Sequence, residues 1–261
     1  MKIALLASGS SGNFTFVSGG GTRILFDAGT CCRTIRSALS SIGEDAAALD
    51  AICLTHDHDD HVRALATLEK KYSGIPLYAT DGTIEAVCRG CGDAAGDWPW
   101  TSIAPGEPFD VGALRFEPFS VPHDAADSVG YVVTDGTVRF GLATDIGSVP
   151  ANVRRALRDC DALALEFNHD PEMLRMSSRP WSLKQRIAGR SGHLSNPDAA
   201  DLLAAVATPR LKAVFPVHVS AECNAPHLAV RAAREALERV GLDPGIVRDP
   251  VYPASMLELP F

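Results

Sequence analysis

The stretch Thr55-His56-Asp57-His58-Asp59-Asp60-His61 crowds four residues of metal-binding type into a few positions: His56, His58, Asp60 and His61. The apolar run at 50–54 before it has the pattern of a short buried strand. Residues 62–68 after it carry apolar side chains at helical spacing. The stretch is therefore predicted to form a strand-to-helix turn.

Such a turn would let these side chains act together. Residues two apart on an extended segment point the same way, so His56 and His58 can bind one metal ion. Asp60 and His61 lie past the turn and can bind a second ion beside the first. A solvated polar loop is the alternative. Imidazole is the usual ligand of zinc and its neighbours, however, and three histidines so close together favour a metal site.

The composition is that of an ordinary globular protein. The chain has 261 residues, of which 46% are apolar and 21% are charged, which suits one large domain or two small ones. No apolar run approaches membrane-spanning length, and the apolar start at 1–7 is too short for a signal peptide. We therefore expect a cytoplasmic protein that does not bind a membrane.

The cysteines and the net charge narrow the possibilities further. The odd number of cysteines, seven, does not suit a disulfide framework. Cys88 and Cys91 could be half of a metal site or two ordinary reduced thiols. The net charge of −8 argues against a protein that coats nucleic acid by bulk charge. It leaves room for a nuclease whose basic surface is local.

The order of the predicted elements indicates an α/β protein. Both halves begin with strands and continue with strand–helix units, and no low-complexity segment or linker divides them. Among the predicted helices are one over 61–73 and one over 180–190. We therefore predict a single domain over residues 1–261, with two sheets packed face to face and helices outside.

More residues of metal-binding type follow predicted strands. His123, Asp145 and His218 each come directly after an apolar strand, on three different strands. With the opening cluster they make seven candidate ligands, about the number that two metal ions and a shared water require. Asp27 also closes an apolar strand, either as a strand-end cap or as a partner that orients a ligand histidine.

The pattern His-x-His-x-Asp-His, with a later His, Asp and His, resembles the metallo-β-lactamase fold hydrolases over nearly the whole chain. The segments at 8–13, 166–170 and 192–196 are similar to those of the YycJ (WalJ) branch, whose members are described as metal-dependent nucleases with 5′-to-3′ exonuclease activity. The resemblance implies a four-layer αββα sandwich of two mixed sheets. One departure is Cys223, which stands where the branch usually has the first of two asparagines.

The resemblance also implies roles for individual residues. His56, His58 and His123 would hold one metal, Asp60, His61 and His218 the other, and Asp145 would bridge them. The catalytic residues would be His193, Asp60 and Glu166, with Glu166 orienting His193. Four further residues would support the ligands or contact substrate: Asp27, Asn13, Asn168 and His169, of which His169 could equally be structural.

Together these features predict a metal-dependent phosphodiester hydrolase. Two divalent ions per chain, whether zinc, manganese or iron, suit ligands without cysteine, and they can supply a bridging hydroxide. His193 could then act as general acid. A basic stretch suits a phosphate backbone, although a solvated helix face would look the same: Arg179, Lys184, Arg186 and Arg190.

The substrate favoured is nucleic acid, DNA in particular, cut from its 5′ end. The chain lacks the large inserted domain of RNA-processing relatives, which argues against a long RNA. The alternatives are a small-molecule or cyclic-nucleotide phosphodiesterase and a thioester or lactam hydrolase on the same fold. The oligomeric state and the choice of metal stay open.

Overall fold

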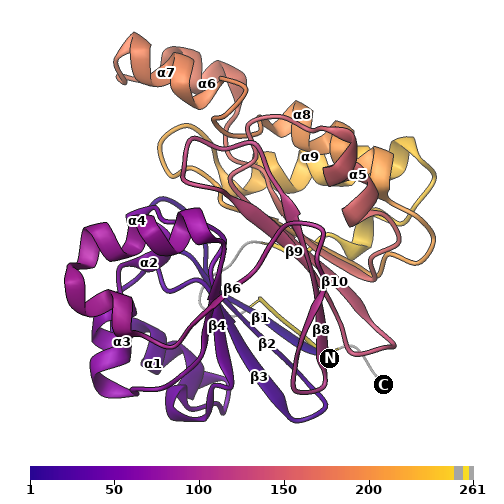
Figure 1. Ribbon diagram of the computed structural model, residues 1–261. Helices are drawn as coiled ribbons and strands as arrows, with labels where there is room; N and C mark the ends of the chain where they lie inside the picture. Colours follow the sequence, from indigo (N-terminus) through magenta and orange to yellow (C-terminus); the bar gives the residue numbers. More distant parts are fainter. Residues whose placement is uncertain (250–254, 259–261) are drawn as a thin grey trace.

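Two β-sheets pack face to face (Figure 1), in a computed structural model that describes residues 1–249 and 255–258. In the first sheet β1, β2 and β3 are antiparallel neighbours, and β3 to β6 run parallel. The spatial order of its seven strands is β13 (Ser255–Glu258), β1 (Lys2–Ala7), β2 (Phe14–Gly19), β3 (Thr22–Phe26), β4 (Ala51–Cys53), β5 (Leu77–Ala79) and β6 (Trp100–Ser102).

The second sheet is also mixed. Its strands β10, β11 and β12 are parallel, whereas β7 to β10 are antiparallel neighbours. The spatial order of its six strands is β12 (Ala213–Val217), β11 (Ala162–Glu166), β10 (Arg139–Ala143), β9 (Val129–Thr134), β8 (Leu114–Ser120) and β7 (Phe109–Val111).

Helices cover the outer face of each sheet (Figure 1). The first sheet carries α1 (Cys32–Ser41), α2 (Asp59–Val62), α3 (Leu65–Lys71) and α4 (Asp81–Cys91). The second carries α5 (Ala151–Leu157), α8 (Asn196–Val206) and α9 (Pro226–Arg239). Two short helices project beyond the sheets as an arm, α6 (Pro171–Met176) and α7 (Trp181–Ile187). Single 3₁₀ turns occur at Ala46–Ala48, Asp93–Asp97 and Pro244–Ile246. In the part of the chain described, none of the helices has the length and apolar character needed to cross a membrane.

Three apolar clusters hold these four layers together, because strand side chains alternate between the two faces. On β3, Ile24 and Phe26 enter the cluster between the sheets, whereas Leu25 enters the cluster under the helices of the first sheet. The cluster between the sheets is rich in aromatic rings, and the ring centroids of Phe26 and Tyr131 lie 5.2 Å apart. A third cluster lies under α5, α8 and α9. The predicted αββα sandwich is confirmed.

The helix predicted over 61–73 is two helices in the structure, α2 and α3. Hydrogen bonds with residues distant in sequence interrupt it. The carbonyl oxygens of Asp60 and His61, which would continue α2, instead accept hydrogen bonds from the backbone N–H groups of Asn13 (2.8 Å) and Ala28 (2.6 Å). The N–H of Ala64 donates to the oxygen of Ala28 (2.8 Å). The helix is thus interrupted to attach the metal-ligand turn to the loops that follow β1 and β3.

Tyr131 provides a test of how the two sheets support this turn. Its hydroxyl, fully buried between the sheets, donates to the carbonyl oxygen of Leu54 at 2.6 Å, directly before the turn. Tyr131→Phe removes the donor from a buried acceptor, so the free energy of unfolding should fall by about 1–3 kcal/mol. Urea denaturation of the metal-free protein should show a lower midpoint with an unchanged slope.

Tyr72→Phe is the matched control. The hydroxyl of Tyr72 has no hydrogen-bond partner among the described residues, so this variant should change stability by less than about 0.5 kcal/mol. Equal losses in the two variants would show that the Tyr131 hydrogen bond contributes nothing specific.

Candidate metal centre

The predicted ligands meet at one end of both sheets, where their strands finish. The first sheet supplies the residues after β3 and β4, and the second supplies the residues after β8, β10 and β12. Parallel strands bring their carboxyl ends to one edge, which is the usual position of sites in α/β sheets. The members of the overlapping groups that could hold a metal are His56, His58, Asp60, His61, His123, Asp145, Glu166, His193 and His218.

Three of the residues that follow these strands have left-handed backbone conformations. The φ angles are 59° at Asp27, 57° at Asp145 and 55° at His218. Non-glycine residues rarely adopt such angles, and the cost is of order 1–3 kcal/mol at each position. Strain of this kind persists where the surrounding structure enforces it, and here it turns each side chain toward the common centre.

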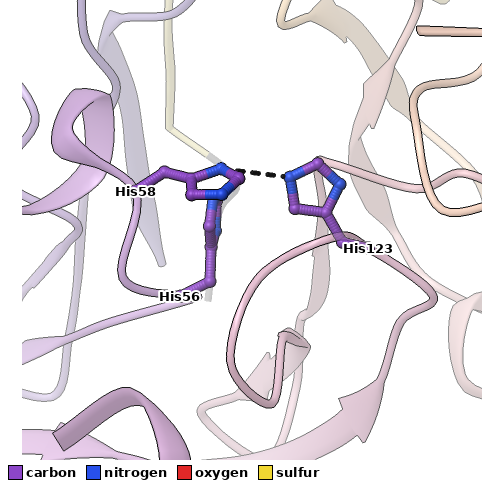
Figure 2. A group of neighbouring side chains, drawn as sticks. All are labelled: His56, His58 and His123. Atoms are coloured by element: carbon purple, nitrogen blue, oxygen red, sulfur yellow. Dashed lines mark hydrogen bonds between the residues drawn. The ribbon is translucent and has the colours of Figure 1, made fainter. Parts of the chain in front are cut away.

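His56, His58 and His123 form one half of the centre. Figure 2 shows the three rings converging from two loops, with His58 Nδ1 3.3 Å from His123 Nε2. His56 Nδ1 faces the hydroxyl of Thr55 at 3.0 Å. His123 Nδ1 lies 3.1 Å from the carbonyl oxygen of Gly192, to which it can donate. The Nδ1 contacts of His56 and His123 direct their Nε2 atoms into the centre, whereas His58 presents its Nδ1 atom there.

Asp60, His61 and His218 form the other half, and Asp145 lies between the halves. The Asp145 Oδ2 atom is 3.3 Å from His61 Nε2, while its Oδ1 atom is 3.5 Å from His218 Nε2 and 3.7 Å from His123 Nε2. Asp60 Oδ2 lies 3.7 Å from both His61 Nε2 and His218 Nε2. The structure therefore brings together both predicted triads and places the predicted bridging carboxylate against each.

Asp27 holds the turn from beneath. Its buried carboxylate accepts hydrogen bonds from the backbone N–H of Thr55 (2.8 Å) and from the Thr55 hydroxyl (3.0 and 3.1 Å). It also lies 2.8 Å from His61 Nδ1, which donates to it in the tautomer that leaves Nε2 free for a metal. Of the two sequence interpretations of Asp27, the geometry favours the partner that orients a ligand.

Glu166 connects His193 to a ligand. Its Oε1 atom lies 2.9 Å from the Nδ1 atoms of both His193 and His218. Its Oε2 atom accepts from the backbone N–H groups of Ile146 (2.9 Å) and Leu194 (3.1 Å). Both oxygens of this fully buried carboxylate are occupied, so it orients the two imidazoles and has no lone pair directed at a metal.

The loops that carry these residues touch through glycines. A Cβ atom on Gly29 would lie 1.5 Å from the carbonyl oxygen of Asp60. A Cβ on Gly147, two residues after Asp145, would lie 2.4 Å from the backbone nitrogen of Gly192, beside His193. Only glycine permits these approaches, which set the spacing between ligand-bearing turns.

The protonation of the histidines differs across the centre. Burial lowers the pKa of His56 and His123, which favours the neutral imidazole that binds metal. At His61 and His218 burial also lowers the pKa, but nearby carboxylates, including that of Asp145, outweigh it and the pKa rises. Wherever these two rings are protonated, a metal binding there displaces a proton.

The carboxylates of the centre have lowered pKa values. Burial raises the pKa of Asp60, Asp145 and Glu166, but adjacent histidines outweigh burial and lower each pKa below its usual range. At His193 the carboxylate of Glu166 outweighs burial and raises the pKa. His193 therefore retains a proton at higher pH than an ordinary histidine does.

Several buried atoms at the centre have no hydrogen-bond partner among the described residues. They include His56 Nε2, Asp145 Oδ2 and His218 Nε2. Burying such atoms unpaired is costly, and a divalent cation would satisfy all three. The donors are imidazole nitrogens and carboxylate oxygens without thiolate, a set that suits zinc, manganese or iron. The residues present therefore fit a metal.

A groove opens over the centre, and its rim is basic. The cavity holds about 320 Å³ and is lined by ligands, by Leu183 and Ile187 of the arm, and by Arg63, Arg179 and Arg186. Sequence reasoning missed Arg63, because only the break between α2 and α3 directs it to this rim. Its position two residues after His61 was the available signal.

The structure does not bring the whole predicted basic stretch to the groove. The Lys184 amine donates to the carbonyl oxygens of Arg175 (2.8 Å) and Ser177 (2.7 Å), so it stabilises the arm itself. Arg190 is exposed and does not line the groove. The predicted helix over 180–190 was too long, because α7 ends at Ile187 and leaves Arg190 outside it.

The remaining predicted residues are structural neighbours of the ligands. The Asn13 amide lies 3.1 Å from Asp60 Oδ2 and 3.0 Å from His61 Nε2. The Asn168 amide donates to the carbonyl oxygen of His218 at 3.0 Å. His169 is buried, belongs to none of the metal-capable groups among the described residues, and pairs with Ser195 through its backbone.

The seven cysteines are all free. Cys88 and Cys91 belong to no metal-capable group in the described part of the chain, so nothing here supports half a metal site at α4.

Comparison with known proteins agrees with this geometry. Residues 22–219 match the family described as "Beta-lactamase superfamily domain". The chain is 32% identical over 245 residues to a Bacillus anthracis protein named exodeoxyribonuclease YycJ, covering 94% of this chain and 92% of that protein. It is 35% identical over 246 residues to the exodeoxyribonuclease WalJ of Streptococcus pneumoniae serotype 2, covering 94% and 91%.

The fold also has solved counterparts. The metallo-β-lactamase fold protein YhfI from Bacillus subtilis superposes with a TM-score of 0.74, covering 98% of each chain. At 14% sequence identity this likeness concerns the fold alone.

Asp27→Asn tests the support beneath the turn. Asparagine tolerates the left-handed backbone and keeps the shape of the side chain, but it removes the charge that orients His61. Metal affinity, measured by titration of the metal-free protein, should fall roughly 10–100-fold. The control is Asp159→Asn, at an exposed aspartate with the same left-handed conformation (φ 60°) outside the centre, which should keep full affinity. Equal affinity in the two variants would exclude an orienting role for Asp27.

Proposed function

The chain belongs to the metallo-β-lactamase superfamily, in the branch of the YycJ and WalJ exodeoxyribonucleases, and on this basis we propose that it is a metal-dependent exonuclease that degrades DNA from its 5′ end. The observation that carries the proposal is the placement of two ligand triads and a shared carboxylate at the floor of a groove with a basic rim. We infer further that residues 1–261 act as one domain in the cytoplasm, where seven free thiols are stable.

The centre would hold two divalent ions per chain. His56, His58 and His123 would hold one and Asp60, His61 and His218 the other, with Asp145 between them; the support is the contact of Asp145 with both halves. When bound, such a pair supplies an activated water and positive charge for the oxygens of a phosphodiester. Zinc, manganese and iron are all compatible with these donors.

His193 would supply the proton that the leaving oxygen needs. Its Nδ1 atom is held by Glu166, and its side chain is about one-fifth exposed at the groove. The Glu166 carboxylate raises the pKa of the His193 ring, which favours the protonated form that a general acid requires. Glu166 would act by fixing the direction of the ring.

The groove would bind the DNA strand through its arginines. Arg179 and Arg186 line it from the arm, and Arg63 lines it from the first sheet. Each side chain is at least one-quarter exposed, so phosphates can reach the guanidinium groups. These three arginines gather positive charge at the groove of a chain whose net charge is −8.

Two other activities stay as alternatives on the same fold. A thioester or lactam hydrolase would need neither the His193–Glu166 pair nor a basic rim. A phosphodiesterase for small or cyclic nucleotides would use His193 but would favour an enclosed pocket, whereas this groove is bordered by exposed residues such as Asp59 (side chain 74% exposed).

Digestion of end-labelled strands tests the proposed function. With manganese or zinc, the protein should release labelled mononucleotides first from a 5′-labelled DNA strand and only at the end from a 3′-labelled one. RNA, bis-p-nitrophenyl phosphate and a lactam should be assayed in parallel. Early release of the 3′ label, or internal cuts, would contradict 5′-to-3′ degradation, and hydrolysis of the small diester without DNA degradation would favour the phosphodiesterase alternative.

Substitution of His193 tests the general acid. His193→Ala should retain its metal but lose about 10²–10⁴-fold in kcat on DNA, whose leaving group is a poor one. The loss should be much smaller on bis-p-nitrophenyl phosphate, because p-nitrophenolate leaves without a proton. An equal loss on both substrates, at full metal content, would argue against proton donation by His193.

A further inference from the structure

The Ser8–Asn13 loop follows β1 and reaches the groove, and it contacts the metal ligands through its two ends, Ser8 and Asn13. The loop is held at both ends. The Ser8 hydroxyl accepts from the backbone N–H of His218 at 2.6 Å, and the backbone N–H of Gly9 donates to Asn13 Oδ1 at 2.7 Å. The N–H of Gly12 donates to the oxygen of Gly9 at 3.0 Å.

The tip of the loop carries hydrogen-bond donors for which the described residues provide no acceptor. The backbone N–H groups and hydroxyls of Ser10 and Ser11 have no hydrogen-bond donor role among residues 1–249 and 255–258, and both residues are exposed. Gly9 and Gly12 have φ angles of 135° and 137°, which allow the tight turn that exposes these groups together. Successive free N–H groups in a turn form a concavity that binds anions.

Two arginines line the same groove as this tip. Arg63 donates to the carbonyl oxygen of Ser11 at 3.2 Å and pairs with the exposed Asp59. Arg179 comes from the arm and pairs with Glu222 at 3.0 Å, while its buried Nε has no partner in the described part of the chain. Exposed ion pairs of this kind contribute little, so a phosphate can compete for both guanidinium groups.

The loop and the arginines occupy one flank of the metal centre. Ser10, Arg63, Arg179 and Ser220 all line the same groove as Asp60 and His218. The loop contacts those two ligands directly, through Asn13 and Ser8. The other flank, beside His123, is bordered by the Asp124–Arg186 ion pair.

We propose that the tip of the Ser8–Asn13 loop, with Arg63 and Arg179, binds a second phosphate of the substrate, one nucleotide from the phosphate at the metal centre. The proposal rests on the proposed function for its substrate. The phosphate is either the terminal group of a 5′-phosphorylated strand or an internal diester, and both offer the same oxygens to the same donors. In either case the subsite sets the position of the strand relative to the scissile bond.

Inhibition of bis-p-nitrophenyl phosphate hydrolysis by the metal-loaded enzyme tests the subsite. Thymidine 3′,5′-bisphosphate should inhibit about tenfold more tightly than thymidine 5′-monophosphate, because its second phosphate gains charge-assisted hydrogen bonds. Arg63→Ala and Arg179→Ala should each lose most of that preference. The control is Arg89→Ala, which removes an exposed arginine paired with Glu85 at the same i,i+4 spacing as Arg63 with Asp59, but on α4 outside the groove. Equal inhibition by the two nucleotides in the wild type, or an unchanged preference in both groove variants, would overturn the proposal.

Labelled DNA strands identify which phosphate is bound. If the KM of Arg63→Ala rises only for 5′-phosphorylated strands, the subsite binds the terminal phosphate; an equal rise for 5′-hydroxyl strands assigns it to an internal phosphate. An unchanged KM for both strands would again overturn the subsite. If the wild type degrades no DNA, the exonuclease function fails, and the bisphosphate comparison still decides the subsite by itself.

Discussion

The metal-ligand turn depends on one buried carboxylate, that of Asp27. It receives the backbone N–H and hydroxyl of Thr55 and the ring N–H of His61, so one side chain sets both ends of the turn. Thr55 in turn faces His56 Nδ1. A carboxylate this deeply buried would be costly without these partners, and the left-handed backbone at Asp27 adds to the cost. The hydrogen bonds around it therefore stabilise the turn and orient two ligands at once.

The layers of the fold and the cluster of ligands could be predicted from the sequence, because both produce local sequence patterns. Alternating and continuous apolar runs mark the strands, and His123, Asp145 and His218 each lie within three residues of the end of a strand. The break between α2 and α3 left no such signal, because it depends on hydrogen bonds from Asn13 and Ala28, distant in sequence. Lys184 does not line the groove for a different, local reason: its amine donates to two carbonyl oxygens within its own arm.

Although the chain is acidic overall, the charged side chains at the groove are arranged as pairs of opposite charge. Each arginine at the groove has a carboxylate neighbour: Asp59 beside Arg63, Glu222 beside Arg179 and Asp124 beside Arg186. Without substrate these arginines are therefore already paired with carboxylates, so an isolated anion gains little from them. A bound phosphate must exchange partners with these carboxylates, which favours substrates that make several contacts together over isolated anions.

The ligands come from both sheets: His56, His58, Asp60 and His61 from the first, and His123, Asp145 and His218 from the second. An ion held by both therefore crosslinks the sandwich, and unfolding must release it. By mass action, a free ion at a thousand times its dissociation constant would add about 4 kcal/mol to the stability at each site. The fraction of protein that stays folded would then depend on the metal supply of the cell. A shortage of metal would lower the amount of folded enzyme as well as the metal occupancy of its sites.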